Sequence, residues 1–255
     1  MSDTHNARAG QRGGLRASVR EVIVAIDGPG GAGKSSVARE AARRLGLDFL
    51  DTGAMYRAAT ALAIDHAIAI DDEDAIEKLA REAHLRFDWT SDPPRLMAFG
   101  MPMTSRLRDA DVDAKVSAVA GLPKVRALMV DLQQRIGREH PKLLTEGRDQ
   151  GSVVFPDALV KIYLTASVDA RAKRRADQIR RVDEKRTVDE GAIARELEAR
   201  DVSDKSRAVG PLVCADDAIE VDTSDMTFEQ SVAQVVRIVR DAIDAAAAEA
   251  DGQRP

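Results

Sequence analysis

The sequence is poor in cysteine, and Cys214 is the only one in 255 residues. A single thiol cannot form a disulfide within the chain, so we expect a reducing compartment, the cytoplasm. No catalytic partner for Cys214 is evident nearby in the sequence, so we expect an inert side chain. Long apolar runs are missing as well. None approaches the roughly 20 residues that a membrane-spanning helix needs, so we expect no contact with a membrane.

An excess of charge of one sign is also missing. The formal net charge is −5 although 32% of the residues are charged. This argues weakly against bulk binding of polymeric nucleic acid and leaves a local basic pocket as an alternative. The four histidines show no metal-ligand spacing, so no zinc site is expected. Residues 1–20 are polar and rich in Gly and Arg, which excludes a secretory signal and indicates a disordered leader, with a basic arm that contacts a partner as the alternative.

The octapeptide GPGGAGKS at residues 28–35 carries the strongest functional signal. It fits the phosphate-loop pattern G-x-x-x-x-G-K-[ST], in which glycines let backbone N–H groups surround phosphates. Lys34 can reach the β- and γ-phosphates, and the Ser35 hydroxyl can join the Mg²⁺ shell. The alternative is a Gly-rich turn that binds nothing. We predict that a nucleoside triphosphate contacts Gly28, Pro29, Gly30, Gly31, Ala32, Gly33, Lys34, Ser35 and Ser36.

Strands and helices alternate along most of the chain, which has 44% hydrophobic residues for a core. Apolar runs predict strands at 21–26, 48–51, 142–146, 158–166 and 218–223. Helical spacing predicts helices at 35–46, 52–68, 71–83, 167–181 and 227–250, the last with a capping box at Thr227 and Gln230. This order is typical of an α/β fold with a central parallel sheet, whose ligands bind at the carboxyl ends of the strands.

Residues 85–108 break the alternation. Short mixed runs separated by SDPP and by Gly100-Met101-Pro102 predict a small antiparallel meander. It is either a structural flap that packs on itself or a subdomain that closes over a substrate, and turn chemistry alone does not choose between them.

Arginines follow several of the predicted strands. Arg57 and Arg148 lie in segments that the proposed sheet brings toward the phosphate loop, and Arg200 and Arg207 lie in a third basic segment. Guanidinium groups bind phosphate oxygens in a bidentate manner, so such a cluster suggests a second anionic ligand beside the triphosphate. Each arginine taken singly is more often a solvated surface residue.

Several stretches resemble the bacterial cytidylate kinases, a family of nucleoside-monophosphate kinases. These are IDGPGGAGKSS (26–36), LDTGAMYRA (50–58), VSAVAGLPKVR (116–126), EGRDQGSVVFPDALVKIYLTAS (146–167) and RDVSDKSRAVGPL (200–212). The DxGAxYR and EGRDxGxVVFPDA strings are specific to this family rather than to phosphate-loop proteins in general. The chain departs from the family near Ser203, where other members carry an extra arginine.

The resemblance implies a three-layer P-loop NTPase-type fold. A kinase domain at 21–250 would carry an inserted CMP-binding subdomain at about 80–120 and a helical lid at about 168–190, with a tail at 251–255. The implied activity is transfer of the γ-phosphate of ATP, with Mg²⁺, to CMP or dCMP by a monomer. Another P-loop small-molecule kinase, or a nucleotide-dependent switch or binding module, remains an alternative on the same scaffold.

The resemblance also implies roles for individual residues. Arg57 and Arg148 would hold the substrate phosphate, Arg200 and Asp204 the ribose hydroxyls, and Arg207 would add charge near the phosphates. Thr52 would help to hold CMP, and Ser117, Arg126 and Asp149 would recognise cytosine. Lys34, Arg148, Arg174 and Arg175 would stabilise the transferring phosphate, with Arg171 as a further candidate on the lid.

Two of these roles have alternatives. A carboxylate such as Asp149 can accept a hydrogen bond from the cytosine 4-amino group, but a strand-end acid can equally serve Mg²⁺, and the resemblance favours recognition of the base. The arginines of the helix at 167–181 can instead form a solvated basic face.

Overall fold

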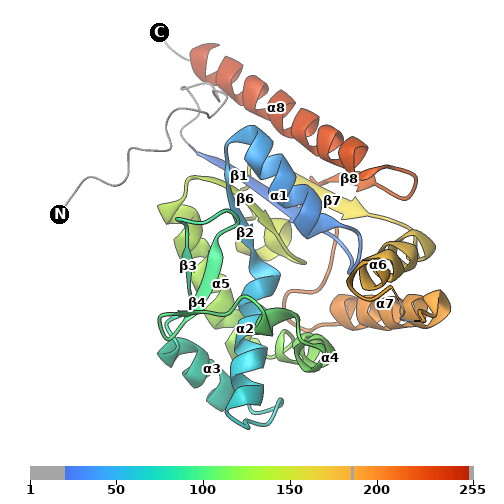
Figure 1. Ribbon diagram of the computed structural model, residues 1–255. Coiled ribbons are helices and arrows are strands. Elements are labelled where there is room, and N and C mark those ends of the chain that lie inside the picture. Colours follow the sequence, from blue (N-terminus) through green and yellow to red (C-terminus); the bar gives the residue numbers. More distant parts are fainter. Residues whose placement is uncertain (1–20, 185–186, 253–255) are drawn as a thin grey trace.

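The computed structural model describes residues 21–184 and 187–252. The predicted leader at 1–20 and residues 253–255 of the predicted tail lie outside this range. Five parallel strands form the central sheet in the order β2-β6-β1-β7-β8 (Figure 1). They are β1 (Val22–Asp27), β2 (Asp48–Asp51), β6 (Lys142–Glu146), β7 (Val160–Thr165) and β8 (Ile219–Asp222). All five predicted strands are therefore confirmed.

The two faces of the sheet carry separate hydrophobic clusters, because side chains alternate along each strand. Val22, Val24 and Ile26 of β1 pack with α1 (Lys34–Leu45) and α8 (Phe228–Gly252). Ile23, on the other face, packs with α2 (Thr52–Asp65) and α5 (Pro123–Glu139). The three-layer α/β prediction is confirmed, and the completely buried β1 explains the continuous apolar run.

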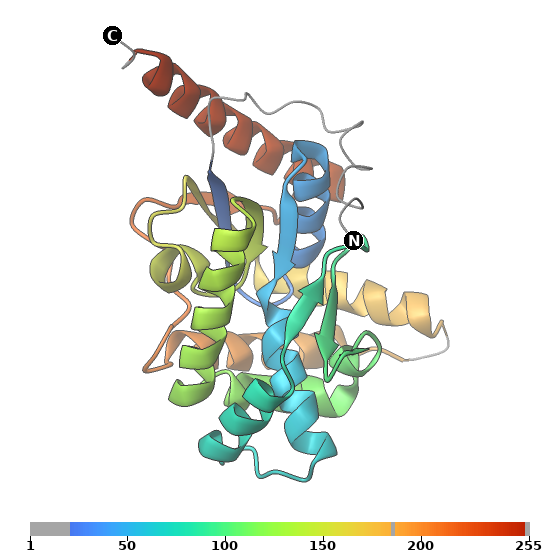
Figure 2. The same ribbon diagram turned by 90° about the vertical axis from the view of Figure 1, so that its left-hand side faces the viewer.

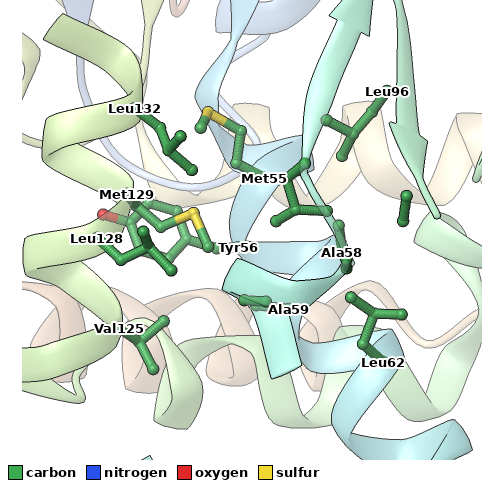
Figure 3. Packing of buried hydrophobic residues seen from close by; sticks show 14 of the residues in the cluster. Met55, Tyr56, Ala58, Ala59, Leu62, Leu96, Val125, Leu128, Met129 and Leu132 are labelled. Carbon is green, nitrogen blue, oxygen red and sulfur yellow. The ribbon is translucent and has the colours of Figure 1, made fainter. Parts of the chain in front are cut away.

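α2 lies at the centre of the second cluster. Its Met55, Tyr56 and Leu62 side chains lie between α5 on one side and Leu96 of the small sheet on the other (Figure 3). The Asp51 carboxylate accepts a hydrogen bond from the N–H of Ala54, 3.0 Å away, and so caps the start of α2. This cap fixes the direction in which α2 leaves the carboxyl end of β2.

The segment at 85–108 forms a three-stranded antiparallel sheet, as predicted. Its strands are β3 (Arg86–Asp88), β4 (Arg95–Ala98) and β5 (Met101–Pro102), paired in that order. Figure 2 shows this sheet, in green, standing beside the light-blue α2, and Phe87 and Leu96 are buried in the same cluster as α2. The sheet therefore does not pack only on itself.

The remaining helices are α3 (Glu73–Glu82), α4 (Ala110–Val119), α6 (Val168–Val182) and α7 (Glu190–Lys205), with a short 3₁₀ turn at Arg106–Arg108 and a π-helical turn at Gln150–Val154. Helices α4, α5 and α7 were not predicted from the sequence.

The capping box of α8 is present, since the Thr227 N–H donates to Gln230 at 2.8 Å and the Gln230 N–H donates to Thr227 at 3.2 Å. α8 continues to Gly252, two residues into the stretch expected as a tail. No helix in the described part is long and apolar enough to span a bilayer.

Candidate active site

The phosphate loop joins the end of β1 to the start of α1, as the motif requires. Gly28 passes so close to β7 that a Cβ atom there would overlap the carbonyl oxygen of Leu164. Lys34, in the first turn of α1, is buried, and its Nζ donates to the Pro29 carbonyl oxygen 2.9 Å away. Burial and the neighbouring Arg148 lower the pKa of this ammonium group. A polyanion at the loop would oppose this shift and stabilise the charged lysine.

The carboxylate of Glu146, at the end of β6, faces the loop and was not predicted as a site residue. It is buried and accepts a hydrogen bond of 2.7 Å from the Ser35 hydroxyl. Burial and the nearby Asp51 raise its pKa. No group of three or more His, Cys, Asp or Glu side chains within residues 21–184 and 187–252 is arranged to hold a metal ion. The oxygen donors of Ser35 and Glu146 nevertheless fit Mg²⁺, which usually keeps waters and substrate phosphates in its shell.

A second carboxylate, Asp27, connects the loop to the next strand end. Its two oxygens accept hydrogen bonds from the N–H groups of Gln150 and Gly151, at 2.8 and 2.7 Å. Burial raises the pKa of Asp27 to about 6, against these two hydrogen bonds, which lower it. Asp27 thereby fixes the backbone that directly follows Arg148 and Asp149.

The predicted arginines gather around Asp204 of α7. The Arg148 Nε donates to Asp204 at 2.8 Å, the Arg207 guanidinium donates to the other carboxylate oxygen, and the Ser117 hydroxyl donates to it at 3.2 Å. Arg148 also borders the phosphate loop, because a Cβ atom on Gly30 would lie 3.7 Å from its Nη2. The arginine cluster and the phosphate loop are therefore adjacent.

Arg126 and Asp149 form a buried ion pair beside this cluster. The Arg126 Nη1 also donates to the Ala120 carbonyl oxygen at 3.1 Å, and the guanidinium lies 5.5 Å from the centroid of the Tyr56 ring. Burial raises the pKa of Asp149, while Arg126 opposes the shift. Gly210, in the left-handed region at φ +59°, closes one side, since a Cβ atom there would lie 2.5 Å from Oδ2 of Asp149.

Three further predicted residues border the same region. Thr52 is buried, and its hydroxyl donates to the Glu146 carbonyl oxygen at 2.7 Å. Arg57 donates to the Leu107 carbonyl oxygen at 3.0 Å. The Nε of Arg200 is buried and has no hydrogen-bond partner among the described residues. Burial lowers the pKa of Arg200 to about 10, and the neighbouring Arg148 guanidinium adds to this shift.

The three candidate arginines of α6 point to different places. Arg171 is buried and donates to the Gly30 carbonyl oxygen at 2.9 Å, so it supports the phosphate loop. Arg174 donates to Thr223, after β8, at 3.1 Å. Arg175 is exposed and pairs with Asp113 of α4 at 3.1 Å. Of the three, Arg175 contacts the helix that also carries Ser117.

Comparison with known proteins decides the family. The model of the family described as cytidylate kinase matches residues 24–241. The chain belongs to the cytidylate kinase family. The cytidylate kinase of Streptomyces avermitilis is 41% identical over 229 residues, which are 89% of this chain and 96% of that protein. The cytidylate kinase of Mycobacterium avium is 43% identical over 220 residues, 86% and 96% of the two chains. Among solved structures, a shikimate kinase from Bacteroides thetaiotaomicron covers 86% of the chain and 98% of its own, with a TM-score of 0.39 at 12% identity, which is too remote to add to the assignment.

Sequence reasoning missed several residues at the site of this cytidylate kinase family member. Glu146 could have been noticed as an acid at the end of a predicted strand, and Gly210 as a glycine between charged segments. The Tyr56 ring, whose centroid lies 5.5 Å from the Arg126 guanidinium, belongs to the stretch LDTGAMYRA that resembles the family. Asp113 gave no local signal, because its partners are distant in sequence.

Proposed function

We propose that this protein transfers the γ-phosphate of ATP to CMP or dCMP, giving CDP or dCDP and ADP. The family assignment supports this activity over another small-molecule kinase or a nucleotide switch. The structural observation that carries it is the contact between the phosphate loop and the arginine cluster, with Gly30 against Arg148. Two phosphorylated ligands bound at these places would meet end to end.

ATP would bind at the loop residues 28–36, with Lys34 against its β- and γ-phosphates. Mg²⁺ would be held by the nucleotide phosphates and the Ser35 hydroxyl, with Glu146 oriented toward it, and it would offset negative charge on the transferring group. Arg171 and Arg174, which contact the Gly30 and Thr223 segments, would support this donor side.

CMP would bind in the adjoining cluster. Its phosphate would meet Arg57 and Arg148, with Arg207 adding charge, and Arg200 and Asp204 would bond to the ribose hydroxyls. Ser117, Arg126 and Asp149 would surround the cytosine, with Thr52 beside them. The buried pair of Arg126 and Asp149 supports this placement, because a carboxylate can accept the 4-amino proton of cytosine but faces the carbonyl oxygen of uracil.

The reaction needs no covalent intermediate on the protein. An oxygen of the CMP phosphate attacks the γ-phosphorus of ATP, and the bond to the β,γ-bridging oxygen breaks as ADP leaves. The protein contributes alignment and positive charge from Lys34, Arg148 and the α6 residues Arg174 and Arg175. The protein would act as a monomer in the pyrimidine nucleotide metabolism of the cytoplasm.

A coupled assay of ADP formation with CMP, dCMP, UMP, AMP and shikimate as acceptors tests it. We expect turnover with CMP and dCMP and a preference for CMP over UMP of about ten- to a hundredfold, since an unpaired buried polar group costs about 1–3 kcal/mol. Preferred use of shikimate, or slow hydrolysis that no acceptor stimulates, would refute the proposal.

A further inference from the structure

Asp113 of α4 occupies an unusual position between two arginines that belong to different parts of the fold. Its Oδ1 lies 2.6 Å from Nη2 of Arg57 on α2, and its Oδ2 lies 3.1 Å from Nη2 of Arg175 on α6. α4 packs against both α2 and α7, and it lies beside α2 in Figure 1. One carboxylate therefore joins the acceptor side of the site to the helix that follows β7.

This arrangement resembles the way in which a phosphate is held. Two guanidinium groups approach two oxygens of one anion from different elements, as they would approach a phosphate group. The Asp113 side chain is only 29% exposed, so the carboxylate is partly withdrawn from water. It is also close enough to the cluster for its charge to raise the pKa of Arg200, against the lowering by burial and by Arg57.

We propose that Asp113 is a resident anion that competes with the substrate phosphate for Arg57 and Arg175, and so sets the affinity for the acceptor. A phosphate held by Arg57 would lie close to the Asp113 carboxylate, and two anions at this separation repel each other. Binding of the acceptor must therefore separate Asp113 from at least one arginine. The inference rests on the proposed function, because it concerns the same phosphate.

The opposite role would be to orient the arginines. If Asp113 held Arg57 in the geometry that the phosphate needs, removing its charge would weaken binding. The Leu107 carbonyl oxygen already fixes Arg57 through Nη1, independently of Asp113. For this reason we expect competition to dominate over orientation.

The experiment compares Asp113→Asn, which keeps the shape of the side chain but removes its charge, with Asp111→Asn on the same turn of α4. Asp111 pairs with Arg106 instead, so Asp111→Asn removes the same charge at a position away from the cluster. Calorimetry would measure binding of CMP and of cytidine, which has no phosphate, and steady-state assays would give KM for CMP and ATP. Asp113→Ala is a second variant in case the asparagine variant does not fold.

We expect Asp113→Asn to lower the Kd and KM for CMP by about two- to tenfold, because two partly exposed ion pairs no longer compete. Affinity for cytidine should stay the same, and Asp111→Asn should behave as the unmodified protein does. An unchanged or higher KM for CMP, or an equal gain for cytidine, would overturn the inference. If the unmodified protein formed no ADP in response to CMP, the proposed function itself would fail, which is a separate outcome.

Discussion

Gly210 offers a sharp test of the proposed cytosine site. Its φ of +59° lies in the left-handed region, and a Cβ atom would overlap Nη2 of Arg126 and lie 2.5 Å from Oδ2 of Asp149. Gly210→Ala therefore combines backbone strain with a steric clash at a buried ion pair. The clash can be relieved only if the pair separates or the chain at 210 moves away.

Gly100 separates these two effects. It has a similar conformation, φ +77°, in the turn between β4 and β5, but a Cβ atom added there would meet nothing within 4 Å. Both alanine variants carry left-handed strain, about 1–3 kcal/mol. Gly210→Ala should lower the free energy of unfolding by about 3–5 kcal/mol more than Gly100→Ala does, since disrupting one partner of a buried ion pair is strongly destabilising.

Thermal unfolding and steady-state kinetics would measure the outcome. The additional loss corresponds to a Tm lower by about 10 °C for a chain of this size. We also expect Gly210→Ala to raise KM for CMP more than about tenfold, with a smaller effect on KM for ATP. Equal Tm values for the two variants together with an unchanged KM for CMP would refute the placement of cytosine beside Arg126 and Asp149.

Three other predictions concern single charged groups. Lys34→Ala should reduce turnover about 10²- to 10³-fold with every acceptor, and an effect no larger than that of Lys124→Ala, an exposed residue paired with Asp74, would contradict the role of Lys34. Asp149→Ala should reduce the CMP-to-UMP preference by about tenfold or more, so an unchanged ratio of kcat/KM values would exclude recognition of the base by this carboxylate. Asp27 has a folded-state pKa raised to about 6, so it binds its proton more tightly in the native state and its contribution to stability is lost as pH rises from about 4 to 6. In urea unfolding, Asp27→Asn should remove about 3 kcal/mol of this decline, and parallel curves for the two proteins would count against it.

The features predicted from the sequence are those encoded by neighbouring residues. A β-branched run such as VIVAID can be recognised without its partners, because a central parallel strand is buried on both faces. The phosphate loop combines glycine, lysine and serine within eight residues. The capping box of α8 spans only four residues, and its hydrogen bonds are those predicted.

The helices that were missed lack such signals. In α7, Ile193 and Asp204 are the only buried side chains among its described residues, so its sequence shows no apolar stripe, and contacts with α6 hold it in place. α4 is short and has apolar residues on several faces. α5 did carry a signal, since Pro123 stands at its first turn, where proline is favoured.

The charges at the site show why pairing could not be predicted. Arg148 meets Asp204, and Arg57 meets Asp113, although the partners of each pair are separated by 56 residues. Local sequence cannot assign such pairs, because the fold alone decides which strand ends and helices meet.

The same pairs explain how a cationic site can exist before its ligands arrive. Guanidinium groups that crowd together away from water repel one another. Burial lowers the pKa of Arg200, and the charge of Arg148 lowers it further. The Nε of Arg200 also has no hydrogen-bond partner among the described residues. The carboxylates of Asp204, Asp149 and Asp113 supply the compensating charge. Aspartates near the arginines are thus a structural requirement of such a site rather than an accident of composition. An incoming phosphate takes over part of that compensation, so its affinity depends on how readily each aspartate releases its arginine, and the partly exposed Asp113 should release more readily than the buried Asp204.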